Sequence, residues 1–241
     1  MPGPLLAPHP AAFPVHPPTD LGDPEAIISN DWAAFASLKH TKNHWDRPGW
    51  TDQTRLLYWL LTFDEPSLLE AVLDHQERLR SLGLDQIRPG DLHLTLARVG
   101  DRQSLSPQQL RELVRTATDH VGAAFSLEFH PLTGSPGAVR YSVTPWTDLV
   151  ALHNTLTQVH RHLCLPGGKP TTRYRPHLGL GYQSCAREAG PVIDAVGRLR
   201  LQPPIPLTVR HVDLVELRRD PGRYTWDRLA RVPLDDRHQL N

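Results

Sequence analysis

His93-Leu-Thr-Leu96 and His177-Leu-Gly-Leu180 are two short stretches with almost the same sequence, far apart in a chain of 241 residues. Side chains two positions apart on a β-strand point to the same face of the sheet. His93 and Thr95 are therefore expected on one face of a strand, and the two leucines on the other. The second stretch alternates in the same way. Each strand is predicted to bury its leucines and to present a histidine on its polar face.

Two histidines that face each other can act as a general acid and a general base. Imidazole has an unperturbed pKa near 6.5, so both protonation forms exist near neutral pH. One ring can take a proton from an attacking water while the other protonates a leaving oxygen. Thr95, or backbone N–H groups near Gly179, could bind phosphoryl oxygens whose charge grows. A lone histidine among the 14 of this chain would more often be structural, but two matching stretches favour a shared site.

The rest of the chain alternates short strands and helices, which predicts an α+β fold. Strands are expected over residues 55–63, 91–99, 125–129, 138–144, 175–182, 207–218 and 224–232, and helices over 66–83, 107–121, 145–163 and 186–199. Gly83 is expected to end the first of these helices, and Ser106 with Gln109 to begin the second. The two histidine stretches both fall on predicted strands.

Composition limits the class of protein. Lys and Arg number 26 and so do Asp and Glu, which argues against coating of long nucleic acid by bulk charge. No apolar run approaches the roughly 18 residues of a membrane span. Cys164 and Cys185 are too few for a disulfide scaffold, which favours a reduced, cytoplasmic setting. Eight prolines in the first 24 residues predict an extended or disordered leader.

At this point the sequence resembles the 2H phosphoesterase superfamily, and more closely its bacterial 2′,5′ RNA ligase-like proteins. The resemblance covers residues 43–234, after a leader and extension over 1–42 and before a tail over 235–241. It is carried by Asn43-His-Trp-Asp-Arg-Pro-Gly-Trp50, Tyr58-Trp59, Asp91-Leu-His-Leu-Thr-Leu96, Tyr174-Arg-Pro-His-Leu-Gly-Leu180 and Tyr224-Thr-Trp226. It implies a bilobal fold of two pseudo-symmetric antiparallel-sheet lobes, with helices outside and the histidines facing across a central cleft.

The resemblance also implies chemistry and roles. It implies metal-independent reactions of 2′,3′-cyclic phosphates or 2′,5′ linkages, with His93 as the acid, His177 as the base and Thr95 on a phosphoryl oxygen. Gly179 departs from the family pattern, which has Thr or Ser there. The loss of one hydrogen bond to a charged group, about 1.5–3 kcal/mol, could slow turnover; alternatively, glycine could let phosphate approach the backbone. We expect Gly179→Thr to raise hydrolysis if a missing donor is the reason.

Other side chains are candidates for contacts with substrate. Arg175 shares the face of His177 and is the preferred arginine for phosphate, whereas Arg98 faces away by strict alternation. Trp45, Trp59 and Tyr182 are candidates for stacking on a base, with Trp50. Tyr182 needs a bulge or bend to reach the site, and each aromatic taken singly is more simply a core residue. Arg55 is a further, lesser candidate for phosphate.

The sequence leaves several functions open. The leading hypothesis is hydrolysis of a 2′,3′-cyclic phosphate on an RNA end or a small nucleotide, without cofactor or metal. His40 with His44, and His153 with His160, lack a third ligand in a recognisable metal motif. No phosphate-binding loop for ATP is present, so ligation would be reversed cleavage. Alternatives are a non-catalytic binder of RNA ends or cyclic nucleotides, and an enzyme for cyclic oligonucleotides or ADP-ribose cyclic phosphate. A monomer without membrane contact is expected.

Overall fold

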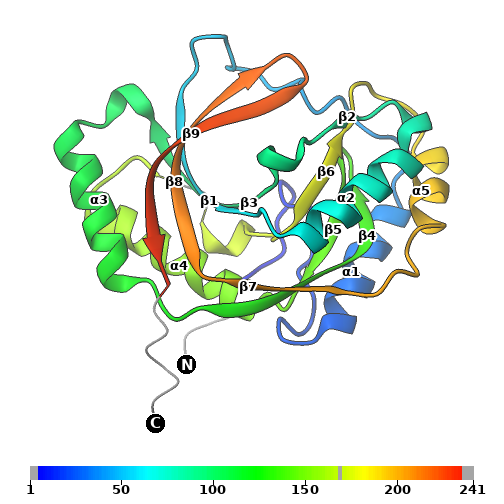
Figure 1. Cartoon of the computed structure of the whole chain (residues 1–241), viewed down its shortest axis with the longest axis horizontal. Helices are drawn as coiled ribbons and strands as arrows, with labels where there is room; N and C mark the ends of the chain where they lie inside the picture. Colours follow the sequence, from blue (N-terminus) through cyan, green and yellow to red (C-terminus); the bar gives the residue numbers. More distant parts are fainter. Residues whose placement is uncertain (1–4, 168–169, 235–241) are drawn as a thin grey trace.

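The computed structural model describes residues 5–167 and 170–234, which form two antiparallel sheets with helices packed against them (Figure 1). The first sheet has the order β3-β1-β8-β9, from His93–Asp101, Leu56–Thr62, His211–Asp220 and Arg223–Pro233. The second has the order β2-β6-β5-β4-β7, from Asp85–Gln86, Leu178–Tyr182, Ala138–Thr144, Phe125–Ser135 and Ile205–Val209. The predicted α+β fold of two antiparallel-sheet lobes is confirmed.

The helices of the described residues lie at the two ends of the molecule and pack against the sheets. They are α1 (Pro24–Ala36), α2 (Pro66–Arg78), α3 (Pro107–His120), α4 (Thr147–His162) and α5 (Gly190–Gly197). Figure 1 shows α3 at one end, and α1 and α5 at the other, with both sheets between them. None of the described helices is long and apolar enough to cross a membrane.

Local signals set the helix ends. The Ser106 hydroxyl accepts a hydrogen bond from the Gln109 N–H, and the Gln109 side chain accepts one from the Ser106 N–H. This reciprocal pair is the predicted capping box. Gly83 adopts a left-handed conformation, with φ 60°, after a 3₁₀ turn that follows α2. The helix predicted over 186–199 is shorter than expected, because α5 begins only at Gly190 with Pro191 in its first turn.

The chain passes from one sheet to the other at Arg210. The sequence predicts one strand over 207–218, but the structure has two. β7 ends at Val209 at an edge of the second sheet, and β8 begins at His211 in the first sheet. The alternation of apolar residues continues where the chain leaves one sheet and enters the other. The sequence pattern of β7 followed by β8 is therefore the same as that of one long strand.

A bulge in β3 changes which residues share a face. Trp59 of β1 pairs with Ala97 of β3, but the next residue of β1, Leu60, pairs with Thr95. The extra residue in β3 at this point shifts the alternation. As a result Arg98, which pairs with Tyr58, lies on the face of His93 and Thr95. The prediction that Arg98 faces away is therefore wrong.

Residues 5–23, within the predicted extended or disordered leader, contain no helix or strand but pack against the rest of the protein, and α1 follows from Pro24. Leu6, Ile27 and Phe35 are buried, and α1 packs on β4 and β5 of the second sheet. Asp23 caps α1 through the N–H of Glu25, a helix start that could have been found in the sequence. Residues 1–4 and the predicted tail at 235–241 lie outside the described residues.

Candidate functional site

His93 is the first residue of β3 and is held in one orientation by the backbone. Its Nδ1–H donates to the carbonyl oxygen of Asp91, 2.8 Å away. A carbonyl can only accept, so the neutral ring carries its proton on Nδ1 and leaves the lone pair of Nε2 free. Trp226 of β9 lies against the ring, with ring centroids 4.9 Å apart in an edge-to-face arrangement. Nε2 is thus the atom of His93 that can accept or deliver a proton.

His177 repeats this arrangement at the start of the other motif. It directly precedes β6, and its Nδ1–H donates to the carbonyl oxygen of Arg175 at 2.9 Å. In both motifs the acceptor is the carbonyl two residues before the histidine. The residues around β3 and β6 are in contact, and a positive charge on His93 disfavours one on His177. The structure therefore brings the two histidines of the separate stretches near each other. His93, His177 and Thr95 are together called the histidine site below.

Both histidines are biased toward the neutral form. Loss of water around the rings lowers the pKa of His93 and lowers that of His177 to about 3. His177 has surface open to solvent, so its ring is reachable although protein surrounds it. The positive charges of Arg140 and Arg47 add to the lowering of the His177 pKa. A neutral His177 with a free Nε2 is suited to accept a proton from water.

The two positions after the histidines differ in space as well as in sequence. Thr95 is half-buried on the His93 face of β3. At Gly179 a Cβ atom would lie only 2.9 Å from Cδ1 of Ile87. Ile87 is itself buried and is tied to β6 through the carbonyl of Leu180. A side chain at position 179 would therefore require the Cδ1 end of Ile87 to move.

Arg47 is a cation of the site that the sequence analysis missed as a candidate. It is exposed, and its Nε–H donates to the carbonyl of His44 at 3.1 Å. Its charge acts on His177, and also on Tyr58 of β1 and Tyr224 of β9. The only signal in the sequence was its place within the 43–50 stretch. Trp226, which contacts His93, was likewise quoted in the resemblance but given no role.

Arg175 serves the N-terminal segment instead of the histidine site. Its guanidinium is buried and donates to backbone carbonyls only, those of Ala7, Pro14, Val15, Thr172 and Tyr174. The structure thus contradicts the predicted phosphate contact. Alternation along the strand places Arg175 on the face of His177, but the carbonyls of the leader, together with those of Thr172 and Tyr174, take up its donors.

The predicted stacking residues have different surroundings. Trp59 is fully buried, with its Nε1–H bonded to Nε2 of His160 at 3.0 Å, so the prediction that it stacks on a base is wrong. Tyr182 lies inside an aromatic cluster with His44, Trp45, Trp50 and Tyr224. The His44 ring stacks on Tyr182 at 4.0 Å and takes one of its faces.

Trp45 anchors this cluster and keeps some exposed surface. Its Nε1–H donates to a carboxylate oxygen of Asp85 at 2.7 Å, and it meets Tyr182 edge-on. Trp45 is only partly buried, so stacking of a base on it stays a prediction.

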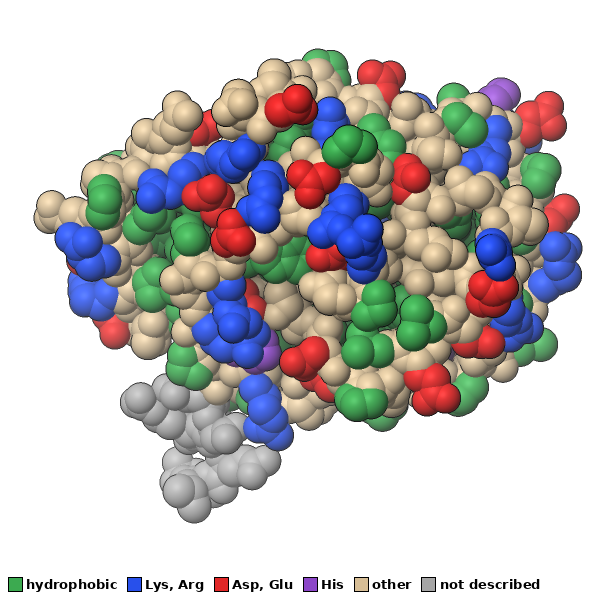
Figure 2. Space-filling model, turned by 45° about the horizontal axis from the view of Figure 1, so that its top comes forward, with side chains coloured by type: hydrophobic (Ala, Val, Ile, Leu, Met, Phe, Trp, Pro, Cys, Tyr) green, Lys and Arg blue, Asp and Glu red, His purple; other side chains and the backbone are tan. Residues whose placement is uncertain are grey.

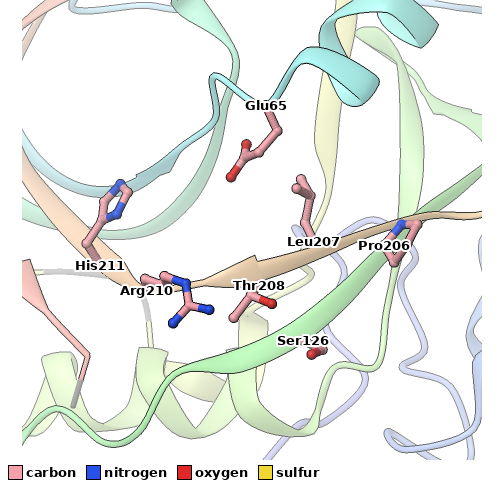
Figure 3. A pocket seen from close by; sticks show the side chains of 7 residues that line it. All are labelled: Glu65, Ser126, Pro206, Leu207, Thr208, Arg210 and His211. Atoms are coloured by element: carbon pink, nitrogen blue, oxygen red, sulfur yellow. The ribbon is translucent and has the colours of Figure 1, made fainter. Parts of the chain in front are cut away.

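Two surface pockets are lined by neither His93 nor His177. Figure 3 shows the first, where Glu65 extends from the turn before α2 toward Leu207 and Thr208 of β7, with His211 at one side. The second is lined by β2, by the β8–β9 turn, and by Arg88 and Arg223 next to them. Within residues 5–167 and 170–234, no three His, Cys, Asp or Glu side chains gather where they could hold a metal ion.

The sequence profile of a known family matches the middle of the chain. The profile of the 2′-5′ RNA ligase superfamily matches residues 67–221, a span that includes both histidine motifs. The chain belongs to the 2′-5′ RNA ligase superfamily. The resemblance to 2H phosphoesterases seen in the two motifs is thereby confirmed. A comparison with curated proteins finds no sequence match.

Several solved structures share the fold at low sequence identity. E. coli LigT in its apo form is 19% identical, with a TM-score of 0.58, over 75% of this chain and 98% of that chain. A structure described as a phosphoesterase is 18% identical, with a TM-score of 0.56, over 76% and 99%. The protein TT0787 of Thermus thermophilus is 19% identical, with a TM-score of 0.55, over 76% and 100%.

Proposed function

We propose that this protein opens 2′,3′-cyclic phosphates of RNA ends or small nucleotides with water, by acid–base catalysis from His93 and His177. The observation that carries the proposal is the matched geometry of the two rings. Each donates Nδ1–H to the carbonyl two residues earlier and leaves Nε2 free. Two imidazole nitrogens free for proton transfer in one site are what an in-line displacement at phosphorus requires.

The residues divide the reaction between them. Nε2 of His177 takes a proton from water, whose oxygen forms a new bond to phosphorus. The bond from phosphorus to the 3′ oxygen breaks, and a protonated Nε2 of His93 gives its proton to that oxygen. The product is a 2′-phosphate with a free 3′ hydroxyl. Thr95 donates its hydroxyl to a phosphoryl oxygen, whose charge grows in the transition state.

The lowered pKa of His177 supports its role as the base. His177, with a pKa near 3, is neutral across the working range and accepts a proton. His93 must be protonated to act as the acid, and an anionic phosphate between the rings raises its pKa toward that state. Because histidines act as both acid and base, the proposed mechanism requires no metal ion.

Ligands of structural relatives support a nucleotide substrate. E. coli LigT has been solved with 3′-AMP, with NADP+ and with ATP, all of which are nucleotides, and with phosphate. By this likeness we propose nucleotides or RNA ends as substrates, in the cytoplasm. Formation of a 2′,5′ linkage would be the reverse of diester cleavage and can use the same two histidines.

Gly179 favours a second candidate function. The site lacks a hydroxyl at this position, and a Cβ atom added there would lie 2.9 Å from Cδ1 of Ile87. A site with fewer donors to the phosphoryl group stabilises the transition state less, so the protein could bind RNA ends or cyclic nucleotides without turning them over. In a further alternative the protein is an enzyme with the same two-histidine mechanism, and its substrate is a cyclic oligonucleotide or ADP-ribose cyclic phosphate.

The test is hydrolysis of 2′,3′-cyclic nucleotides, and of an oligoribonucleotide that ends in a cyclic phosphate, in the presence of EDTA. Products are separated as 2′- or 3′-phosphates, with His93→Ala and His177→Ala run alongside. We expect a 2′-phosphate and a loss of about 10²–10⁴-fold in each variant. Turnover that survives both variants, or that EDTA abolishes, would overturn the proposed mechanism. Binding without turnover would establish the second candidate instead.

A further inference from the structure

Two exposed arginines near the histidine site have no carboxylate partner. Arg98 and Arg47 are both exposed, and neither forms an ion pair within the described part of the chain. By contrast, Arg102 is paired with Glu216, and Arg223 with Asp91. Figure 2 shows that Lys and Arg side chains on the face drawn there mostly have acidic side chains beside them. Unpaired cations beside a candidate phosphate site are available to an anion.

The bulge in β3 determines the direction of Arg98. Paired residues of antiparallel strands place their side chains on the same face, about 4.5–5.5 Å apart at Cβ. Tyr58 pairs with Arg98, and Thr62, four residues later on β1, pairs with His93. Tyr58, Leu60 and Thr62 alternate onto one face, so Arg98 projects from the face that carries His93 and Thr95. Tyr58 is half-buried there.

Arg47 reaches the same region from a loop that both sheets hold. On the side of the second sheet, the N–H of His44 donates to the carbonyl of Gln183 at 2.8 Å, and Trp45 is bonded to Asp85. On the side of the first sheet, Arg219 donates to the carbonyl of Trp45 at 2.9 Å.

The Nε–H bond to the His44 carbonyl occupies only one donor of Arg47, and its terminal nitrogens have no partner among the described residues. The loop contacts to both sheets fix the backbone from which Arg47 extends. Its guanidinium is therefore positioned and still has donors to offer.

Tyr58 is directly opposite Arg98 in the pairing of β1 with β3. The charges of Arg98 and of Arg47 both favour the ionised form of Tyr58. Along β3, Arg98 is three residues beyond Thr95, roughly 7–10 Å at about 3.3 Å per residue with one residue in the bulge. This is too far for Arg98 to share a phosphate with the two histidines, but suits a second phosphate of the same ligand.

We propose that Arg47 and Arg98, on the side of the site that carries Tyr58, form an anion subsite that binds a phosphate of the substrate other than the one attacked. The substrate class is then a nucleotide or RNA end with an additional phosphate, such as one on the 5′ oxygen. This inference rests on the proposed function for the place of the reacting phosphate. It selects substrates with two phosphates over a simple cyclic mononucleotide.

The test compares two ligands that differ by one phosphate. Calorimetry measures binding of 2′-AMP and of adenosine 2′,5′-bisphosphate to the whole protein, to Arg98→Gln, to Arg47→Gln and to Arg111→Gln. Arg111 is an exposed arginine of α3 with no ion pair in the described structure, so its variant removes the same charge elsewhere. Thermal unfolding confirms that each variant is folded.

We expect the bisphosphate to bind about tenfold more tightly than 2′-AMP, the scale of one charge-assisted contact. Arg98→Gln and Arg47→Gln should each bring that ratio close to one, and Arg111→Gln should keep it. The ratio should also fall between about 0.05 M and about 0.5 M salt, because screening weakens an exposed contact.

Two outcomes would overturn the subsite. One is equal binding of the two ligands by the unaltered protein. The other is a preference for the bisphosphate that persists in both arginine variants, which would place the phosphate elsewhere. These measurements need no turnover, so failure of the subsite and failure of the proposed hydrolysis are distinguishable. If hydrolysis occurs, kcat/KM should be higher for the substrate with the 5′ phosphate. Arg98→Gln and Arg47→Gln should reduce this preference, and Arg111→Gln should keep it.

Discussion

His93 and His177 make the same hydrogen bond to the backbone, but the structure supports the two motifs in different ways. The ring of His93 lies against the edge of Trp226, next to a threonine hydroxyl. His177 lies near the positive charge of Arg140, next to a glycine at which an added Cβ atom would lie 2.9 Å from Cδ1 of Ile87. The comparison shows that the same backbone hydrogen bond can orient two histidines whose surroundings differ.

The largest difference lies beneath the second motif. Arg140 pairs in register with Gly179 and is buried 3.6 Å from the carboxylate of Asp31, a residue of α1. The hydroxyl of Ser142 also donates to that carboxylate, at 2.8 Å. On the side of the first motif, the buried carboxylate of Asp213 accepts from Thr62, which pairs with His93, and its ion-pair partner Arg231 is exposed. The N-terminal segment therefore stabilises one motif and not the other.

Asp31→Ala should therefore give the largest effect. It leaves the buried guanidinium of Arg140 without its counter-charge, and loss of one partner of a buried pair costs about 3–5 kcal/mol. We expect the free energy of unfolding, measured with denaturant, to fall by that amount. Ser29→Ala, at an exposed position of the same helix, should change it by less than about 0.5 kcal/mol. A loss below about 1 kcal/mol for Asp31→Ala would show that the helix does not support the second motif.

Thr95→Val tests whether the first motif supplies the phosphate donor alone. Valine keeps the shape of threonine and removes the hydroxyl, so only a contact to phosphate is lost. We expect kcat/KM for a 2′,3′-cyclic nucleotide to fall by about 10- to 100-fold, equivalent to about 1.5–3 kcal/mol. Thr118→Val on α3 serves as the control. An unchanged kcat/KM would mean that the two motifs do not differ in donor function.

Gly179→Thr tests whether the second motif can be made to match the first. The added Cβ meets Cδ1 of Ile87 at 2.9 Å, so the single substitution should overpack the site, at a cost of about 1–3 kcal/mol in stability. Ile87→Val removes the Cδ1 atom. We expect Gly179→Thr with Ile87→Val to raise kcat/KM up to about tenfold, and Gly179→Thr alone to raise it less or not at all.

Kinetics and denaturation of the two single variants and the double variant separate these effects. If the double variant were no more active than Ile87→Val alone, the sequence-based expectation of a missing donor would be wrong.

The pH dependence of kcat/KM reports the difference in electrostatics. As pH rises through the lowered pKa of His93, the acid loses its proton and the rate falls. As pH drops toward the His177 pKa near 3, the base becomes protonated. The optimum should therefore lie below the ordinary histidine pKa of about 6.5. Arg47→Gln removes a positive charge beside His177, so it should move the acidic limb to higher pH. A profile centred well above pH 7 would contradict both lowered pKa values.

Strand faces and helix ends could be predicted because they depend on near neighbours. The leucines of both motifs are buried, as alternation predicts, and Ser106 and Gln109 form the predicted cap. Arg98 was misassigned because its face depends on a bulge, which is a property of the pairing between β1 and β3. Trp59 was misassigned as a stacking candidate because its partner, His160, is on a helix a hundred residues away.

Local sequence was enough to establish that two histidine strands exist, that each buries its leucines, and which family the motifs resemble. These features follow from the two-residue repeat of a strand and from local hydrogen bonds. The folded chain was needed to show that the two histidines share one site, that Arg175 binds the leader, and that Arg98 lies opposite Tyr58 with the charge of Arg47 nearby. The physical reason is that the partners of these side chains belong to segments distant in sequence. A local sequence pattern does not specify which distant segment will pack against it.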